Sequence, residues 1–350
     1  MHFFALLVCS ALVPAAAPEA APQEVSAASA KVHKIKVGGE GGWDYLTADP
    51  DARRLYVSRG DRVVVIDTDK ETVVGELPGT AGVHGIAVVP ELGKGFTSNG
   101  RDSSVTVFDL KTLKATNQIK VSGTPDAILY DSASSRVFTF NHGTDDVTAI
   151  DPKAEKVVGT ITLKAEPEGA AADGKGHVFV NLRSTSEIAE FDGSTLKILN
   201  RWPLAPGTRP TGLGFDPKHR RLFSTCGNQK MVVMDADKGT VITSVEIGRG
   251  ADGCAFDPSK GLAYSSNGGD GTVTVVGEGK TGQYEVVSTI PTQAGARTMA
   301  LDTKTHKLYL SAASPGPAPA TPPAADKTKP QAKGRRNYLP GSFVIIVVGE

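Results

Sequence analysis

YVSRGDRVVVID at residues 56–67 and FTSNGRDSSVTVFD at residues 96–109 share one pattern. Each stretch has a strand led by an aromatic residue, a polar turn, and a valine-rich strand that ends in Asp. The aromatic residue recurs as Tyr56, Phe96, Phe138, Phe179, Phe223, Tyr264 and Tyr309. The terminal Asp recurs as Asp67, Asp109, Asp151, Asp192 and Asp235, at spacings of 42, 42, 41 and 43 residues. One four-stranded propeller blade has a period of about 40–45 residues, so the repeat predicts stacked blades.

The number of copies predicts the architecture. Apolar and polar residues alternate within each copy, which buries one face of each strand against the next blade. Seven copies predict an all-β fold, a single seven-bladed β-propeller domain over residues 31–350. The last copy lacks an outer strand, whereas VHKIKVGG from Val32 resembles VVGELPG from Val73. We therefore expect the N-terminal strand to complete the last blade and close the ring.

Two segments differ in composition from the repeats. Residues 1–30 contain an apolar run from Phe3 to Val13 followed by small residues, which predicts a signal peptide and a flexible leader. We therefore expect export, to the periplasm or outside the cell, with no other transmembrane segment. Residues 312–339 are rich in Pro and Lys and predict a projecting loop within the last blade. Its basic part suits a solvated insertion, or a tether for an anionic partner.

Candidate ligand residues occupy one position of each repeat. Five residues before the end of each predicted innermost strand, the chain carries Asp44, His84, Asp126, Glu168, Thr211, Asp252 and Arg297. These ring positions face the mouth of the central channel, where we also place His142 from a neighbouring loop. Four ring positions are acidic, which is compatible with a divalent cation, and the two histidines extend the choice to transition metals. We expect His84, Asp126, His142 and Glu168 to be the metal ligands if a metal is bound. Alternatively, the carboxylates only support tight turns by accepting backbone hydrogen bonds.

Arginines are expected on the same face. Arg59, Arg101, Arg183, Arg209 and Arg249 all lie in loops that we place at the rim of the channel. They suit a carboxylate, a phosphate or a single-stranded nucleic acid, and some of them are expected to pair with the ring carboxylates. Lys plus Arg and Asp plus Glu both number 38, so no overall field attracts nucleic acid. Nucleic acid is therefore a minor expectation.

The sequence contains little that indicates a known class of enzyme or redox protein. The chain has no C-x-x-C-H, G-x-S-x-G or H-E-x-x-H pattern and no phosphate-binding P-loop. Cys226 and Cys254 fall in neighbouring blades, so the sequence allows either a disulfide or two free thiols.

The aromatic-led strands YVSRG, FTSNG and YSSNG, each followed by a valine-rich strand, resemble those of the YVTN-repeat β-propellers, the YncE-like family. The resemblance covers nearly all of residues 32–350 and implies a propeller, without implying one function. Our first hypothesis is a non-enzymatic binding or scaffold protein of the cell envelope, monomeric, with a small molecule or protein bound at the channel face. The alternatives are a metal-assisted lactonase or lyase at the same face, and an adaptor that recruits protein or single-stranded nucleic acid at the arginine rim.

Overall fold

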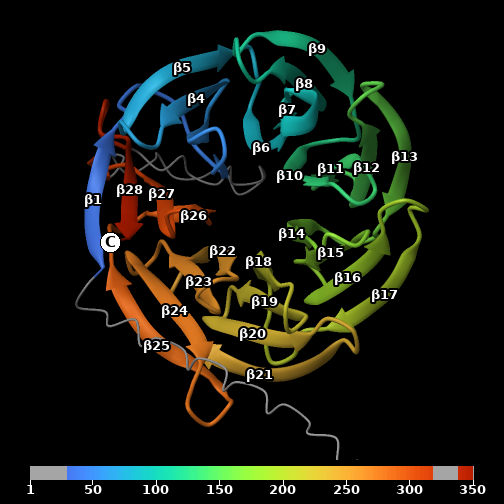
Figure 1. Ribbon diagram of the computed structural model, residues 1–350, viewed down its shortest axis with the longest axis vertical. Coiled ribbons are helices and arrows are strands. Elements are labelled where there is room, and N and C mark those ends of the chain that lie inside the picture. Colours follow the sequence, from blue (N-terminus) through green and yellow to red (C-terminus); the bar gives the residue numbers. More distant parts are fainter. Residues whose placement is uncertain (1–29, 318–337, 350) are drawn as a thin grey trace, which may run out of the picture.

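A computed structural model describes residues 30–317 and 338–349. The predicted signal segment 1–30 lies almost entirely outside the described residues, as does most of the predicted loop 312–339. The described residues form seven four-stranded antiparallel sheets arranged as blades around a central axis (Figure 1). The all-β seven-bladed propeller expected from the repeat is confirmed. None of the described residues form a helix with the length and hydrophobicity needed to cross a membrane.

Each blade contributes four strands, numbered here along the chain. The innermost strands are β2 (Leu46–Asp49), β6 (Val83–Val89), β10 (Pro125–Asp131), β14 (Pro167–Ala172), β18 (Pro210–Asp216), β22 (Ala251–Asp257) and β26 (Arg297–Asp302). The second strands are β3 (Arg54–Arg59), β7 (Lys94–Asn99), β11 (Arg136–Asn141), β15 (His177–Leu182), β19 (Arg221–Cys226), β23 (Leu262–Asn267) and β27 (Lys307–Ala312). One short 3-10 helix, Pro90–Leu92, follows β6.

The outer half of each blade is equally regular. The third strands are β4 (Arg62–Asp67), β8 (Ser104–Asp109), β12 (Asp146–Asp151), β16 (Glu187–Asp192), β20 (Lys230–Asp235), β24 (Thr272–Glu278) and β28 (Val344–Gly349). The outermost strands are β5 (Thr72–Pro78), β9 (Ala115–Lys120), β13 (Lys156–Thr162), β17 (Ile198–Pro203), β21 (Thr240–Glu246), β25 (Tyr284–Pro291) and β1 (Lys31–Lys36).

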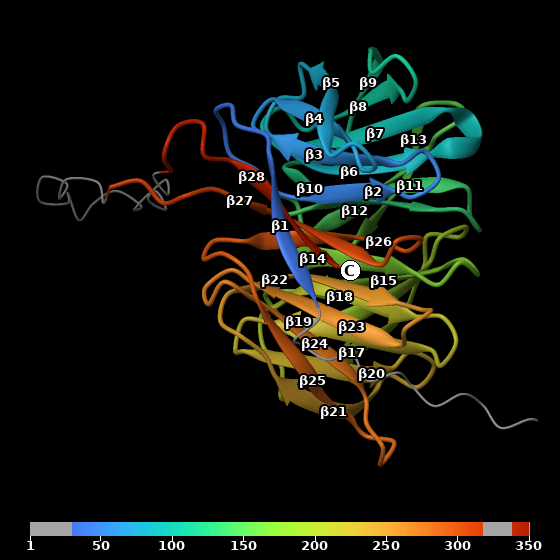
Figure 2. The ribbon, with the colours of Figure 1, turned by 60° about the vertical axis from the view of Figure 1, so that its left-hand side comes forward.

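The N-terminal strand closes the ring as expected. β1 pairs with β28 along its whole length, from Lys31 opposite Gly349 to Lys36 opposite Val344. The two strands lie side by side in Figure 2, where β1 is blue and β28 is red. On the first blade, Arg53 binds Asp302 of the last blade at 2.5 Å. The seam between the chain ends is therefore held by a backbone ladder within the last blade and by a side-chain contact across to the first.

The aromatic residue of the repeat supplies the core between blades. All seven aromatic side chains that lead the second strands are buried. Tyr56 lies 6.0 Å from the ring of Phe108 in the next blade, and Phe223 stacks on Phe256 at 5.1 Å. A blade cannot bury this face alone, so the aromatic position recurs because each blade needs its neighbour.

The Asn of the repeat links the second strand to the third. Buried Asn141 donates to Asp146 at 2.6 Å and to Thr148 at 3.0 Å, and it accepts from Thr139 at 3.0 Å. Asn99 and Asn267 make equivalent contacts in their blades. These three asparagines satisfy buried hydroxyl groups, so a structural role explains this part of the motif.

Candidate functional site

The ring positions sit at irregularities of the innermost strands. In six blades the pairing between the innermost and second strands shifts register at or next to the ring position. In three of them, a hydroxyl of the second strand accepts the next backbone amide, as Ser98 does from Gly85 at 2.9 Å. A β-bulge interrupts the strand pairing locally and changes the direction in which the side chains point. The ring side chains therefore gather at one mouth of the channel.

His84 joins two carboxylates from neighbouring blades. Its Nδ1 lies 2.7 Å from Asp44 Oδ2 and 2.8 Å from Asp126 Oδ1. Burial alone would lower the pKa of His84, but the hydrogen bonds to Asp126 and Asp44 outweigh it and raise the pKa to about 10. Burial raises the pKa of Asp44. For Asp126 the burial effect is overcome by the two histidines and the Tyr45 hydroxyl, which hold its pKa below the usual range.

His142 lies between two buried carboxylates. Its Nε2 is 3.2 Å from Asp126 Oδ2 and 3.8 Å from Glu168 Oε2. This nitrogen is inaccessible to solvent and has no hydrogen-bond partner within the described residues. Glu168 also contacts Arg183. Burial, reinforced by the charge of Asp126, raises the pKa of Glu168 to about 8 despite that guanidinium.

Arg297 completes the ring on the opposite side of Asp44. It binds Asp252 Oδ2 at 3.1 Å, lies 3.9 Å from Asp44 Oδ1, and donates to the carbonyl of Trp43 at 2.9 Å. Arginines therefore pair with ring carboxylates, as the sequence suggested for some of them. Burial raises the pKa of Asp252, and Arg297 opposes that effect.

The ring carboxylates do not support turns. Across residues 30–317 and 338–349, no backbone amide donates to Asp44, Asp126, Glu168 or Asp252. The turn amides are bound instead by aspartates that end strands, such as Asp67, which accepts from two amides at 3.0 and 2.8 Å. Thr211, the neutral ring position, is buried and bonds to Thr225 and to the carbonyl of Ala251. The turn-support alternative is therefore wrong for these four residues.

The arginine rim is smaller than expected. Arg101 and Arg209 are exposed, and Arg249 is exposed but paired with Asp270 at 2.7 Å. Arg59 is only 1% exposed, so its assignment to an accessible rim is wrong. Its guanidinium donates to four backbone carbonyls of residues 38–42 and lies 3.9 Å from the ring of Phe343. Arg59 therefore fixes the segment that leads to Asp44.

The two cysteines of the described residues are free thiols. Cys226 is buried at the end of β19, and Cys254 is half-buried in β22. The disulfide that the sequence allowed is thus not formed. Burial raises the pKa of Cys226 to about 11 and that of Cys254 to about 12, so both are protonated near neutral pH.

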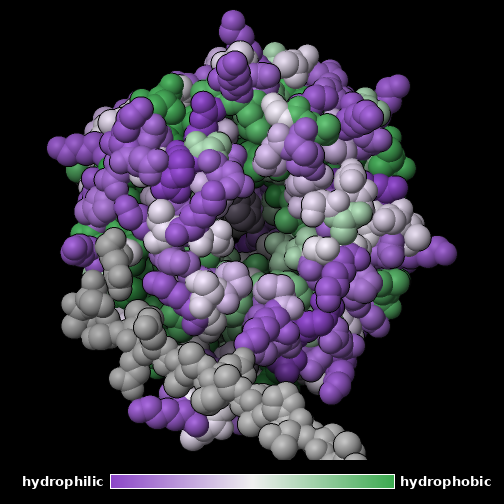
Figure 3. All heavy atoms as spheres, in the orientation of Figure 1, coloured by the Kyte–Doolittle hydropathy of each residue, from purple (hydrophilic) through white to green (hydrophobic). Residues whose placement is uncertain are grey.

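A cavity of about 150 Å³ lies in the channel and was not predicted. All seven innermost strands contribute to its wall, which includes Ile128, Phe140 and Met299. The centre of the ring is hollowed in the space-filling view, within a largely hydrophilic face (Figure 3). The sequence signal was the run of small and apolar residues that follow the ring positions, such as Gly212 and Leu213. The same signal is expected of any packed inner strand, so it did not single out a cavity.

Two groups of side chains have the spacing of metal ligands. Asp44, His84 and Asp126 form one group, and Asp126 joins His142 and Glu168 in the other, with all ligand atoms of a group within 4.8 Å of one another. Nitrogen and oxygen ligands about 2.0–2.2 Å from an ion in tetrahedral geometry lie roughly 3.3–3.6 Å apart. The 3.2 Å between His142 Nε2 and Asp126 Oδ2 lies just below that range, and the 3.8 Å between His142 Nε2 and Glu168 Oε2 lies just above it, so both need only a small movement.

Tyr45 is a site residue that the sequence analysis missed. Its hydroxyl lies 3.4 Å from Asp126 Oδ2 and its side chain lines the cavity. Burial and four surrounding carboxylates raise its pKa well above the usual value, so the phenol stays protonated. Its position directly after Asp44 was the available signal, since most other blades have a small residue there.

No protein-family model and no curated protein sequence matches the chain. The resemblance to YVTN-repeat propellers therefore stays an expectation from the repeat. Among solved structures, hydrazine synthase of Kuenenia stuttgartiensis superposes with a TM-score of 0.69 at 17% identity, over 79% of this chain and 94% of that chain. Two WD40-type propellers also superpose. U3-55K has a TM-score of 0.72 at 10% identity, over 91% of this chain and 98% of its own. A chain of the mitotic checkpoint complex has 0.70 at 13%, over 88% and 95%. These identities establish the fold alone.

Proposed function

We propose that this chain is a binding propeller whose channel mouth holds a divalent transition-metal ion between Asp126, His142 and Glu168. The observation that carries the proposal is the buried Nε2 of His142, which faces two carboxylates and has no hydrogen-bond partner among residues 30–317 and 338–349. Unpartnered buried nitrogen atoms are costly, and a cation would satisfy this one. Nitrogen and carboxylate ligands together suit ions such as Zn²⁺ better than Ca²⁺.

The cost of displacing a bound proton favours a metal ion at Asp126, His142 and Glu168 over one at His84. A metal on His84 Nδ1 would have to displace a proton held with a pKa of about 10. At pH 7 that displacement costs about 4 kcal/mol, or roughly half after allowing for solvent screening of this partly exposed ring. Displacing the proton of Glu168, whose pKa is about 8, costs only about 1.4 kcal/mol at pH 7. His84 then serves as the cation that keeps Asp44 and Asp126 together.

Binding in the cell envelope is part of this proposal. It depends on the export signal expected in residues 1–30, which are outside the described residues apart from Ala30. A metal-assisted lactonase or lyase is a second candidate. Three protein ligands leave a coordination position for water or substrate, as in catalytic zinc sites, and the cavity lies at the same channel. The arginine adaptor has less support, because Arg59 is buried and both Arg183 and Arg249 are paired.

The test is isothermal titration of the chelator-treated full chain with Zn²⁺, Mn²⁺ and Ca²⁺. We expect one transition-metal site, lost in His142→Ala and weakened in Glu168→Gln. His84→Asn should retain it. His219→Ala removes a histidine that pairs with Asp216 outside the site, and is the matched control. At a hundred times its dissociation constant, a bound ion should stabilise the native state by about 2.7 kcal/mol. Absence of binding, or binding that survives His142→Ala, overturns the proposal.

A further inference from the structure

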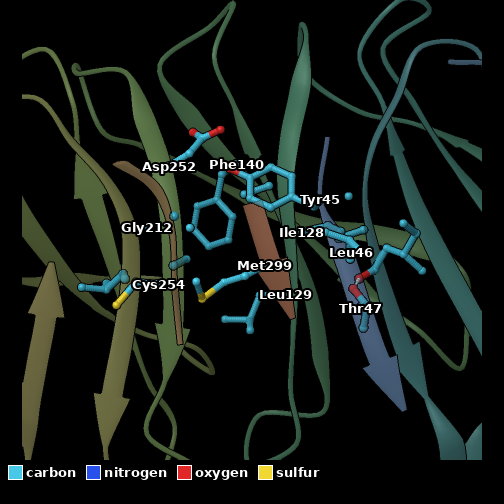
Figure 4. A pocket seen from close by; sticks show the side chains of 17 residues that line it. Tyr45, Leu46, Thr47, Ile128, Leu129, Phe140, Gly212, Asp252, Cys254 and Met299 are labelled. Atoms are coloured by element: carbon cyan, nitrogen blue, oxygen red, sulfur yellow. Dashed lines mark hydrogen bonds between the residues drawn. The ribbon is translucent and has the colours of Figure 1, made fainter. Parts of the chain in front are cut away.

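The side chain of Tyr45 reaches from the first blade to the third. Tyr45 directly precedes β2, whereas Asp126 belongs to β10, and the blade that begins with β6 lies between them. The Tyr45 hydroxyl nevertheless donates a hydrogen bond to Asp126 Oδ2 at 3.4 Å. Figure 4 shows the Tyr45 ring in the channel beside Phe140, which also belongs to the third blade. A residue of the first blade therefore contacts a proposed metal ligand two blades away.

Both the backbone and the ring of Tyr45 are held in place. Its backbone amide donates to the carbonyl of His84 at 3.1 Å. Its carbonyl accepts from the Ser58 amide at 3.3 Å and from the Ser58 hydroxyl at 3.0 Å. Its ring packs against the hydrophobic cluster that contains Ala127 and Phe140. A side chain fixed in this way loses little further conformational freedom, so its hydroxyl oxygen is in place before any ion binds.

The two oxygen atoms of Asp126 have different partners. Oδ1 lies 2.8 Å from His84 Nδ1, whereas Oδ2 lies 3.2 Å from the unpartnered Nε2 of His142. Among the residues that the structure describes, the Tyr45 hydroxyl is the one group that donates a hydrogen bond to Oδ2. Oδ2 is therefore the oxygen that an ion beside His142 would meet, and Tyr45 is the group that holds it.

A phenol suits this position better than a charged donor does. A carboxylate oxygen has two lone pairs, so a hydrogen bond from Tyr45 leaves Oδ2 able to bind an ion. The hydroxyl is uncharged near neutral pH, so it does not repel a neighbouring cation as a lysine or arginine side chain would. Carboxylates that bind metals are themselves hydrogen-bonded, and the loss of such a partner typically lowers metal affinity about 10–100-fold.

We infer that Tyr45 is a positioning residue of the metal site, whose hydroxyl directs Asp126 Oδ2 towards the ion. Because His84 lies at Oδ1, Asp126 binds the ion through one oxygen only, which suits the four-coordinate geometry of Zn²⁺. The inference rests on the proposed function, because it concerns an ion held by Asp126, His142 and Glu168. It goes further by giving a role to a residue that does not itself bind the ion.

Tyr45→Phe is the test, since it removes the hydroxyl and keeps the ring that packs in the channel. In isothermal titration of the chelator-treated full chain, its Zn²⁺ affinity should be about 10–100-fold below that of the wild type. Tyr130→Phe is the matched control. The Tyr130 hydroxyl, on the same strand as Asp126, binds exposed Glu91, so its loss should leave the Zn²⁺ affinity unchanged. Metal-free melting curves that stay close to that of the wild type show that both variants are folded.

A second measurement separates positioning from general weakening. The visible absorption spectrum of bound Co²⁺ reports the arrangement of its ligands, so at saturating Co²⁺ the spectrum of Tyr45→Phe should differ from that of the wild type. Equal Zn²⁺ affinity in Tyr45→Phe and wild type, identical Co²⁺ spectra, or an equal loss in Tyr130→Phe overturns the inference and leaves the proposed function intact. A wild-type chain that binds no Zn²⁺, or binding that survives His142→Ala, overturns the proposed function and this inference together.

Discussion

Raising the pH should destabilise the propeller through His84. In the native state its pKa is about 10, against an ordinary value of 6.5 for histidine, because Asp44 and Asp126 bind the protonated ring. A raised pKa stabilises the folded protein below pH 6.5, and this contribution is lost as the pH rises towards 10. Glu168 acts in the same direction between 4.5 and about 8, since its native pKa is also raised. The free energy of unfolding should therefore fall from neutral to alkaline pH.

The magnitude follows from one proton. Between pH 7 and 9 the unfolded chain has released the His84 proton while the native state retains it, which corresponds to about 1.4 kcal/mol per pH unit. The side chain is 34% exposed, so solvent screening reduces the effect to about half. We expect the wild-type chain to lose about 1–2 kcal/mol more than His84→Asn over this range.

The assay is urea unfolding of chelator-treated protein at pH 7, 8 and 9. Glu168→Gln should remove only the part of the slope that lies below pH 8. Ile35→Ala is destabilised at a distance from the site and should keep the wild-type slope, which separates titration from general weakening. An equal slope in His84→Asn and wild type would refute the assignment of a proton to the Asp44–His84–Asp126 group.

Two further predictions concern the framework. Asn141→Ala removes three hydrogen bonds of a buried side chain and should cost about 2–3 kcal/mol in urea unfolding. Asn117→Ala, at an exposed residue, should cost less than about 0.5 kcal/mol. Equal losses would contradict the role assigned to the repeat asparagine. Ile35→Ala on β1 should lower the free energy of unfolding by about 2–4 kcal/mol, with a single cooperative transition. Val32→Ala, on the same strand but 41% exposed, should lower it far less. A separate early transition for one blade would show that the ring does not unfold as one unit.

The fold could be predicted from the sequence because each repeat carries the residues that a blade needs for packing and for its turns. Tyr56 and its equivalents had to be buried between blades, and Asp67 and its equivalents had to accept turn amides. A strand missing at one end and present at the other left one way to close the ring. The ring positions were found by the same counting, since Asp44, His84 and Asp126 do meet at one mouth.

What the sequence could not supply was the partner of each charged group. Arg59 and Arg183 occupy similar loops, yet one reaches inward to backbone carbonyls and the other to Glu168. The partner of each arginine depends on its side-chain conformation and, for Arg59, on the loop at residues 38–42. Neither feature recurs with the sequence repeat. The cavity was equally hidden, because its existence depends on how closely β18 and β22 approach. At Gly212 a Cβ atom would come within 2.3 Å of the backbone nitrogen of Cys254.

The closure of the last blade by β1 constrains when the molecule can fold. About 300 residues separate β1 from its partner β28, so at the usual rate of about 5–20 residues per second the first strand waits roughly 15–60 s during synthesis for the strand that pairs with it. Until then β1 has no ladder, and the aromatic faces of the first and last blades lack their neighbours. The ring can therefore close only after β28 has been synthesised, and until then the faces that will pack between the first and last blades stay uncovered.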